Sequence, residues 1–333
     1  MQEGHSESPE ICATFRLQDA LVCDMDLPYR RSFYPLGYSI EIVTNEPAVL
    51  AAAEQSFGHV RSLRQTTPLQ VRVGVTHQKG AVLPPEPERH AFAHLFSLAA
   101  DAHNQSLLDL NTGRNFTWIT QATLENCLYF RTNFLEKAVY LLLGASMVTD
   151  LHAACVGRDG RGILLCGRSG AGKSTLAYAC ARQGWTYTSD DTSYLINSAV
   201  NPRVIGHCHR ARFRPEARSL FPELAGRAIT PRMEGKPSIE VPIADLPVDN
   251  ATPEAEIHAV VFLDRRAEDA LRFVPLPRRT ATERMRRELY STGEIRARHE
   301  ELLEIFSDVP SFELQYCKLN DGIEALESLI SQI

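Results

Sequence analysis

The residues with the clearest chemical meaning form one contiguous stretch, Gly167-Arg168-Ser169-Gly170-Ala171-Gly172-Lys173-Ser174, which fits the pattern G-x-x-x-x-G-K-S/T at every specified position. An apolar stretch, Gly162–Cys166, precedes it, and residues that favour a helix follow it. Glycines let such a loop curl until its backbone N–H groups face phosphate oxygens. A helix that begins near Lys173 adds the positive end of its dipole. The motif therefore predicts a P-loop.

Two side chains of the loop have specific expected roles. The Lys173 ammonium is expected to reach the β- and γ-phosphates of a bound nucleotide, and the Ser174 hydroxyl to ligate Mg²⁺. The loop recognises phosphates rather than a base, so it leaves ATP and pyrophosphate open as phosphoryl donors. With ATP as the expected ligand, the predicted binding residues are Gly167, Ser169, Gly170, Ala171, Gly172, Lys173, Ser174 and Thr175.

A pair of carboxylates, Asp190 and Asp191, ends the next predicted strand, Trp185–Ser189. In a parallel sheet the carboxyl end of this strand lies near the mouth of the P-loop. One carboxylate of the pair is placed to hold Mg²⁺, and the other is placed to accept a proton from an attacking hydroxyl.

These motifs occur in a recognisable order: His152-Ala153, then Gly167–Ser174, then Arg182-Gln183-Gly184, then Asp190-Asp191. Over about residues 145–270 the chain thereby resembles the catalytic domain of the HPr kinase/phosphorylase family and its kinase-like relatives. The resemblance implies an α/β fold with a P-loop catalytic domain similar to that of phosphoenolpyruvate carboxykinase.

The resemblance also implies roles for individual residues. His152 becomes an active-site residue near the γ-phosphate, and Asp191 the general base that deprotonates the acceptor hydroxyl. Lys173 and Ser174 hold phosphate and Mg²⁺, and Glu216 falls at about the place of a Mg²⁺-binding glutamate. The resemblance further suggests a homo-oligomer.

The chain departs from the HPr-specific enzymes at several points. Thr175 stands where those enzymes usually carry Glu, their glycine-rich EVRGLGI signature has no counterpart, and the N-terminal half is unlike theirs. We therefore expect an ATP-dependent kinase whose acceptor is a hydroxyl on a protein, a peptide or a small molecule. The alternative is a P-loop NTP-binding regulatory or assembly protein with weak hydrolysis.

Other polar clusters follow the P-loop region. His207-Cys208-His209 is interpreted as part of a strand with two outward histidines, because neighbouring strand residues face opposite sides and do not converge on one metal. The arginines at 210, 212 and 214 alternate, so they line one strand face that either binds an anion or is solvated. A second set follows the predicted strand Ile257–Leu263 as candidate charge stabilisers: Arg265 and Arg266.

Bulk properties narrow the class of protein. The formal net charge is −6, which gives no general attraction for nucleic acid or anionic membranes. The eight cysteines form no CxxC pair, and Met1–Glu10 is polar and acidic, unlike a signal peptide. The most apolar run, Ala138–Val148, is shorter than the about 20 residues that a spanning helix needs. We expect a cytoplasmic protein with reduced thiols and neither nucleic-acid nor membrane partners.

The elements that must position these residues divide the chain into an N-terminal α+β domain over 1–145 and a P-loop catalytic domain over 146–333. Arg278–Phe306 has apolar and charged residues at helical spacing and predicts one helix or a pair. For the first half we expect strands at Tyr38–Val43 and Leu69–Val75, helices at Pro47–Phe57, Ala91–Ala102 and Asn133–Val148, a loop at Gln78–Arg89, and a hairpin of Ser106–Leu110 with Asn115–Thr120.

Overall fold

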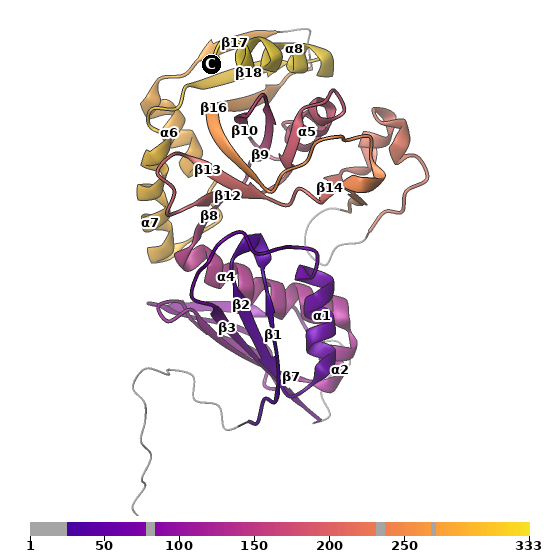
Figure 1. The fold of residues 1–333 in the computed structure, drawn as a ribbon, viewed down its shortest axis with the longest axis vertical. Coiled ribbons are helices and arrows are strands. Elements are labelled where there is room, and N and C mark those ends of the chain that lie inside the picture. The colour runs from indigo at the N-terminus through magenta and orange to yellow at the C-terminus, as the bar shows by residue number, and fades with distance from the viewer. Residues whose placement is uncertain (1–24, 78–83, 231–236, 268–270) are drawn as a thin grey trace, which may run out of the picture.

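The computed structural model describes residues 25–77, 84–230, 237–267 and 271–333, which fold around one seven-stranded and one nine-stranded β-sheet. In Figure 1 the first sheet and its helices form the lower half of the molecule, and the second sheet forms the upper half. Helices pack on both sheets, so the chain is of the α/β class. The predicted domain boundary at residue 145 lies in the last turn of α4 (Glu136–Ser146), just before β8 (Val148–Leu151).

The first sheet has one buried face. In its inner strand β3 (Leu69–Thr76), Val71, Val73 and Val75 all point into the core. Two helices cover that face, α1 (Pro47–Phe57) and α4, and their apolar residues join the same buried cluster. The strand order is β1 (Tyr29–Phe33), β2 (Ile40–Thr44), β3, β7 (Arg114–Thr120), β6 (Asn104–Asp109), β5 (Leu95–Asp101) and β4 (Glu88–Phe92).

Most of the elements predicted in this half are confirmed, including helix α1 and the β6–β7 hairpin. The prediction of a helix over Ala91–Ala102 is wrong, because this stretch forms most of the β4–β5 hairpin. Ala93 at the turn has a positive φ of 50°, and Leu98 is fully buried in the sheet core. Tertiary pairing with β6 thus overrides the helix propensity of the alanines. Of the predicted loop Gln78–Arg89, residues 78–83 lie outside the described residues, and β4 begins at Glu88.

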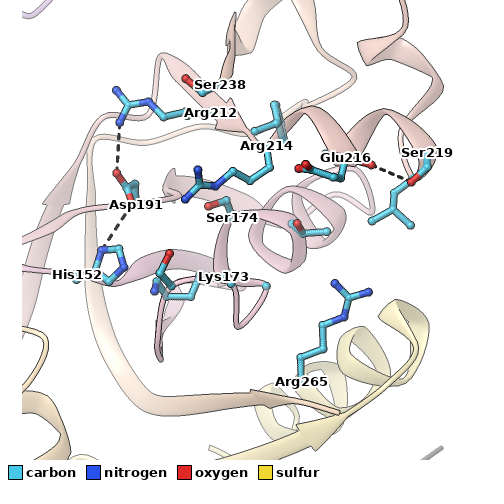
Figure 2. Close-up of a pocket in the computed structure, with 17 residues that line it drawn as sticks. His152, Lys173, Ser174, Asp191, Arg212, Arg214, Glu216, Ser219, Ser238 and Arg265 are labelled. Atoms are coloured by element: carbon cyan, nitrogen blue, oxygen red, sulfur yellow. Dashed lines mark hydrogen bonds and ion pairs between the residues drawn. The ribbon is translucent and has the colours of Figure 1, made fainter. Parts of the chain in front are cut away.

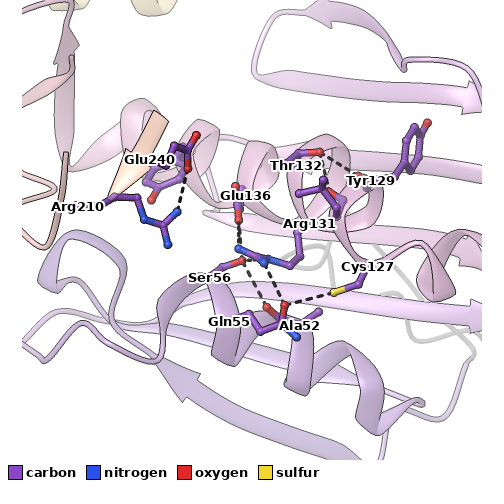
Figure 3. Close-up of polar contacts among 12 residues, drawn as sticks. Ala52, Gln55, Ser56, Cys127, Tyr129, Arg131, Thr132, Glu136, Arg210 and Glu240 are labelled. Carbon is purple, nitrogen blue, oxygen red and sulfur yellow. Dashed lines mark hydrogen bonds and ion pairs between the residues drawn. The ribbon is translucent and has the colours of Figure 1, made fainter. Parts of the chain in front are cut away.

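A cluster of polar side chains connects α1 to the start of α4 by hydrogen bonds (Figure 3). The Arg131 guanidinium donates to Ser56 Oγ at 2.7 Å, to Gln55 Oε1 at 3.1 Å and to Glu136 Oε1 at 3.1 Å. Ser56 also donates to Glu136 Oε1 at 2.7 Å. Arg131 opens a π-helical turn, Arg131–Leu135, that joins α3 (Cys127–Phe130) to α4 after the short α2 (Gln121–Glu125). The cluster fixes the helical layer at the end that faces the second half.

The second sheet is mixed rather than parallel, which corrects the arrangement assumed from the sequence. Strand β9 (Ala154–Arg158) lies between β10 (Arg161–Cys166) and β11 (Thr186–Ser189) and is antiparallel to both. Because β10 also runs parallel to β16 (Glu254–Arg265), the carboxyl ends of β10, β11 and β16 meet at one edge. The strand order is β11, β9, β10, β16, β13 (Arg203–Gly206), β12 (Ser193–Ile196) and β8, with β18 (Ser311–Tyr316) paired to β16 and β17 (Arg272–Pro275).

Helices cover both faces of the second sheet (Figure 1). On one face α5 (Lys173–Ala181) and α8 (Leu319–Ile330) share a buried cluster with the sheet. On the other face lie α6 (Arg278–Arg286), α7 (Gly293–Leu302) and a 3-10 turn, so the charged tail forms a pair of helices as predicted. A two-stranded ribbon, β14 (Arg210–Phe213) with β15 (Ile239–Pro242), lies beside α5.

The two halves share core residues. Ile196 and Ile205 of the second sheet belong to the same buried cluster as α1 and α4. Tyr140 of α4 stacks on Tyr194 at 5.9 Å and packs edge-on against His207 at 5.8 Å. His207 and His209 were predicted to point outward from a strand, and this is wrong. They sit in a turn between β13 and β14 and face the N-terminal half, where the His209 ring lies 3.8 Å from that of His59.

The burial of the histidines has an electrostatic consequence. Removal from water lowers the pKa of His207 to about 4, so its imidazole is neutral at neutral pH. The thiols behave as expected for buried apolar groups, since Cys155, Cys166 and Cys180 are buried and the six described cysteines are all free. Cys12 and Cys23 lie outside the described residues. Within the part of the chain that the structure describes, no helix has the length and apolar character needed to cross a bilayer.

Candidate functional site

A cavity of about 430 Å³ opens at the edge where the carboxyl ends of β10, β11 and β16 meet (Figure 2). The P-loop follows β10, the aspartate pair follows β11, and Arg265 ends β16. His152 joins them from the link between β8 and β9, because antiparallel β9 starts at this same edge. The lining residues are His152, Ser169, Gly170, Gly172, Lys173, Ser174, Thr175, Asp191, Arg212, Phe213, Arg214, Glu216, Ala217, Ser219, Leu220, Ser238 and Arg265.

The glycine-rich loop has the strand-loop-helix geometry that its sequence predicts. Buried β10 leads into it, and α5 begins at Lys173. Gly172 has a φ of +96°, and a Cβ there would collide with the Tyr316 hydroxyl, so this position requires glycine. That hydroxyl donates to the Ala171 carbonyl at 3.1 Å and braces the loop from β18.

The predicted loop residues divide into two groups. Ser169, Gly170, Gly172, Lys173, Ser174 and Thr175 line the cavity. Gly167 and Ala171 do not line it, and they shape the loop instead. Gly167 has a φ of +142°, and a Cβ there would lie 2.9 Å from the Leu263 carbonyl oxygen. The close approach of β16 to the loop therefore depends on this glycine.

Lys173 is only 6% exposed, and its ammonium donates to the carbonyl of Gly167 at the start of its own loop. Burial lowers the pKa of Lys173, and the nearby carboxylate of Glu288 acts in the opposite direction. Burial likewise raises the pKa of Glu288, which accepts a hydrogen bond from the Gly167 N–H. Glu288 thus contacts the P-loop from the segment after α6.

Asp191 lies between two basic side chains at the cavity wall. Its Oδ2 is 3.3 Å from an Arg212 guanidinium nitrogen, and its Oδ1 is 3.6 Å from His152 Nδ1. The Asp191 side chain is 41% exposed, so it is reachable from the cavity. Figure 2 shows it on the same side of the cavity as His152, facing Ser174.

Asp190 occupies a different environment from its neighbour. It is 8% exposed and does not line the cavity, and its Oδ2 accepts a hydrogen bond from the Arg212 backbone N–H at 2.6 Å. Burial raises the pKa of Asp190 to about 7. Its backbone carbonyl accepts from Ser174 Oγ at 3.0 Å. The contribution of Asp190 that the structure shows is this contact, which holds the Ser174 hydroxyl.

The arginines predicted as anion ligands are distributed unequally. Arg212, Arg214 and Arg265 line the cavity, and Glu216 lines it as well. Arg210 does not line it, and its guanidinium lies 3.3 Å from a Glu240 carboxylate oxygen. Arg266 pairs with Asp264 at 2.5 Å and also lies outside the lining.

The comparisons with known proteins are limited to one region. No protein-family model matches the chain. The HPr kinase/phosphorylase of Chlorobaculum tepidum is 30% identical to it over 89 residues, which is 26% of this chain. The chain spans 24% of the length of that relative. The similarity supports a distant kinase-like relationship.

Several residues at this site were not expected from the sequence. Glu288 and Tyr290 approach it from the tail, and Ser219, Leu220 and Ser238 line its outer part. The sequence offers a weak indication for Tyr290, which is the only aromatic residue of Arg278–Glu304. It precedes Ser291-Thr292-Gly293, which interrupts the helical pattern. The others carry no local pattern.

Proposed function

We propose that this protein is an ATP-dependent phosphotransferase that moves the γ-phosphoryl group to a hydroxyl on a protein, a peptide or a small molecule. The observation that carries the proposal is the presence in one cavity of a P-loop lysine, a P-loop serine and a carboxylate: Lys173, Ser174 and Asp191. A P-loop alone accounts for nucleotide binding, whereas transfer to a hydroxyl also requires a group that removes the proton.

The proposed reaction uses the side chains as follows. The acceptor oxygen attacks the γ-phosphorus, the bond to the oxygen that bridges to the β-phosphate breaks, and the hydroxyl proton passes to Asp191. Lys173 and the loop amides stabilise negative charge on the phosphates. His152 lies beside Asp191 and also lines the cavity, where it is placed to donate to a phosphate oxygen.

The residues of the cavity suit Mg²⁺, which prefers oxygen ligands and usually keeps waters and phosphate oxygens in its shell. In this proposal Ser174 and Glu216 hold the ion, and Asp190 acts through its carbonyl contact with Ser174. The bound ion would offset charge on the phosphates. No cluster of three or more His, Cys, Asp or Glu side chains that could hold a metal occurs within the described ranges, and a phosphate-bound ion does not require one.

The similarity to an HPr kinase/phosphorylase supports the phosphotransferase class and leaves the acceptor open. We do not propose HPr as the acceptor, because Thr175 and the unlike N-terminal half separate this chain from enzymes specific for it. We therefore propose a hydroxyl acceptor without specifying the molecule that carries it.

The test uses ATP labelled on the γ-phosphate, incubated with the protein and Mg²⁺ together with a cell lysate or, separately, a metabolite pool. Label on a macromolecule or on a small molecule supports the proposal and identifies the acceptor class. Label found only as free phosphate in both incubations contradicts it and favours an NTP-binding regulator. A parallel incubation with labelled pyrophosphate distinguishes the two possible donors.

The variant Asp191→Asn tests the role of the carboxylate. We expect transfer to fall about 10²- to 10⁴-fold, the usual contribution of a general base, while nucleotide binding persists. Asp249→Asn, at an exposed loop position, serves as the matched control and should leave transfer unchanged. Unchanged transfer in Asp191→Asn would remove Asp191 from the mechanism.

A further inference from the structure

The segment Glu288–Ser291, which follows α6, lies outside the cavity lining and packs directly behind His152, and the proposed reaction does not yet use it. The backbone N–H of His152 donates to the Glu288 carbonyl at 2.7 Å, and Leu289 forms a β-bridge with Leu151. These contacts place Tyr290 directly against His152, although 138 positions separate the two residues in the chain. The rings meet edge to face, with centroids 5.5 Å apart.

Either the phenol or an Nδ1–H can donate in this contact, and the tautomer of His152 decides which of them does. The Tyr290 hydroxyl is hydrogen-bonded to His152 Nδ1. Burial raises the pKa of Tyr290, so the phenol keeps its proton and can donate it. Burial also lowers the pKa of His152, and the adjacent Lys173 ammonium lowers it further. The Asp191 carboxylate and a hydrogen bond with the Asp191 backbone act in the opposite direction, but the net shift is downward and favours the neutral imidazole. A neutral ring whose Nδ1 accepts a hydrogen bond carries its proton on Nε2.

We propose that Tyr290 is a positioning residue that fixes the Nε2–H tautomer of His152 and directs this N–H into the phosphate cavity. Figure 2 shows the second ring nitrogen of His152 on the side of Lys173, away from Asp191. A donor at that position can bind a phosphate oxygen. The inference deepens the proposed function and rests on it for its catalytic meaning, whereas the tautomer itself is a property of the protein without substrate.

Asp191 is the competitor for His152 Nδ1. Its Oδ1 lies 3.6 Å away, too far for a good hydrogen bond but close enough to stabilise a protonated ring. The Lys173 ammonium is the other charged group that acts on the His152 ring, and the ring also has a hydrogen bond with the Asp191 backbone. The Tyr290 hydroxyl therefore keeps Nδ1 occupied, which leaves Asp191 available for the proton of the acceptor.

Tyr290 is 50% exposed as a whole residue, and contacts of the residues on either side of it hold its segment in place. Arg296 of α7 donates to the carbonyls of Leu289 at 3.2 Å and of Ser291 at 3.4 Å. His299, which is 1% exposed, donates from Nε2 to the Gly144 carbonyl at 2.8 Å. Its Nδ1 then accepts from the Ser291 hydroxyl at 2.9 Å. The segment is thus clamped on both sides of Tyr290.

The first test reads the tautomer without any substrate. In protein with ¹⁵N-labelled histidine, the His152 signals are assigned by their loss in His152→Gln, and we expect a predominantly Nε2–H ring. Tyr290→Phe keeps the ring contact and removes the donor, so we expect a mixture of tautomers. Tyr29→Phe, at an exposed position in β1, is the matched control. An Nδ1–H ring in the wild-type protein, or an unchanged tautomer in Tyr290→Phe, would overturn the inference.

The second test reads the pH profile of transfer. Without the Tyr290 donor, Nδ1 binds a proton more readily beside Asp191, so the acidic limb of kcat/KM should move to higher pH in Tyr290→Phe. Loss of one hydrogen bond corresponds to about a threefold to tenfold lower rate below the midpoint. A uniform loss of rate with an unmoved limb would indicate a merely structural role and contradict the inference. If the wild-type protein transfers no phosphate at all, the proposed function fails, and the tautomer measurement still decides this inference.

Discussion

The cavity is shaped by two segments of different origin. The P-loop wall is one continuous stretch, residues 167–175, whose shape follows from its own glycines and from the start of α5. The tail wall, Glu288–Ser291, does not itself line the cavity and lies behind the lining residue His152 because α6 and α7 pack on the second sheet. Chemistry that depends on local backbone geometry can be read from a sequence. Chemistry that depends on how a distant segment docks cannot.

The largest effect should come from the P-loop wall. Lys173→Met removes the buried ammonium, and we expect transfer to fall about 10³-fold, the usual cost of losing one charge-stabilising group at a transition state. Arg168→Ala is the matched control, because Arg168 belongs to the same loop, is exposed and does not line the cavity. Initial rates of transfer from labelled ATP are measured for both variants. Equal losses of rate would show that Lys173 contributes no more to transfer than Arg168 does.

A second prediction concerns Asp190, which belongs to the same motif as Asp191 but is buried behind the cavity. Its pKa is raised to about 7 from an ordinary value of 3.8, so the folded state holds a proton that the unfolded chain releases between those values. The free energy of unfolding should therefore fall as pH rises from about 4 to about 7, by about 3 kcal/mol from this group.

Urea unfolding at several pH values between 4.5 and 7.5 measures this slope. Asp190→Asn keeps an acceptor for the Arg212 N–H and has no proton to lose, so its curve should be flatter than that of the wild-type protein. Asp249→Asn, exposed on a loop, should keep the wild-type slope. Parallel curves for the wild-type protein and Asp190→Asn would show that the buried carboxyl does not titrate in this range.

At the P-loop wall, most but not all features of the site could be predicted from the sequence. The spacing of Gly167 to Ser174 predicted the strand, the loop and the helix that the structure contains. The place of the aspartate pair after a strand predicted that Asp191 would reach the cavity. It did not predict that Asp190 would turn inward, because that depends on the backbone of Arg212 in the β14–β15 ribbon.

Other features depended on long-range packing and were misread for that reason. Ala91–Ala102 has the composition of a helix, yet pairing with β6 makes it part of a hairpin. His207 and His209 are polar residues next to a strand, yet they pack against Tyr140 and His59 of the other half. In each case the deciding partner lies far away in sequence.

The tail wall can be tested through Glu288, whose carboxylate accepts from the Gly167 N–H and lies near Lys173. Glu288→Gln keeps the acceptor and removes a negative charge beside the phosphate site, so ATP should bind about threefold to tenfold more tightly. Glu288→Ala also removes the acceptor and leaves the Gly167 N–H without a partner, which costs about 1–3 kcal/mol if that group stays buried.

We therefore expect Glu288→Ala to be less stable than the wild-type protein and to gain less ATP affinity than Glu288→Gln. Calorimetric titration with ATP and thermal unfolding measure the two quantities. If both variants bind ATP as the wild-type protein does, the tail wall has no influence on nucleotide binding at the P-loop.

The smallest expected effect concerns Arg265, which ends β16 on the opposite side of the P-loop from His152 and Asp191 (Figure 2). Within the described residues its side chain makes no hydrogen bond or ion pair, whereas its neighbour Arg266 pairs with Asp264 at 2.5 Å. Because Arg265 is exposed, Arg265→Ala should raise the dissociation constant for ATP by only about threefold at low salt.

This difference should shrink as salt is added, since an exposed charge is screened within about 10 Å at 0.1 M ionic strength. Arg266→Ala is the matched control, with the same charge removed one position along the chain and outside the cavity lining. Titrations of both variants at two salt concentrations separate a local contact with phosphate from a general effect of net charge. Equal weakening in the two variants would assign the effect to net charge rather than to a contact between Arg265 and the phosphates.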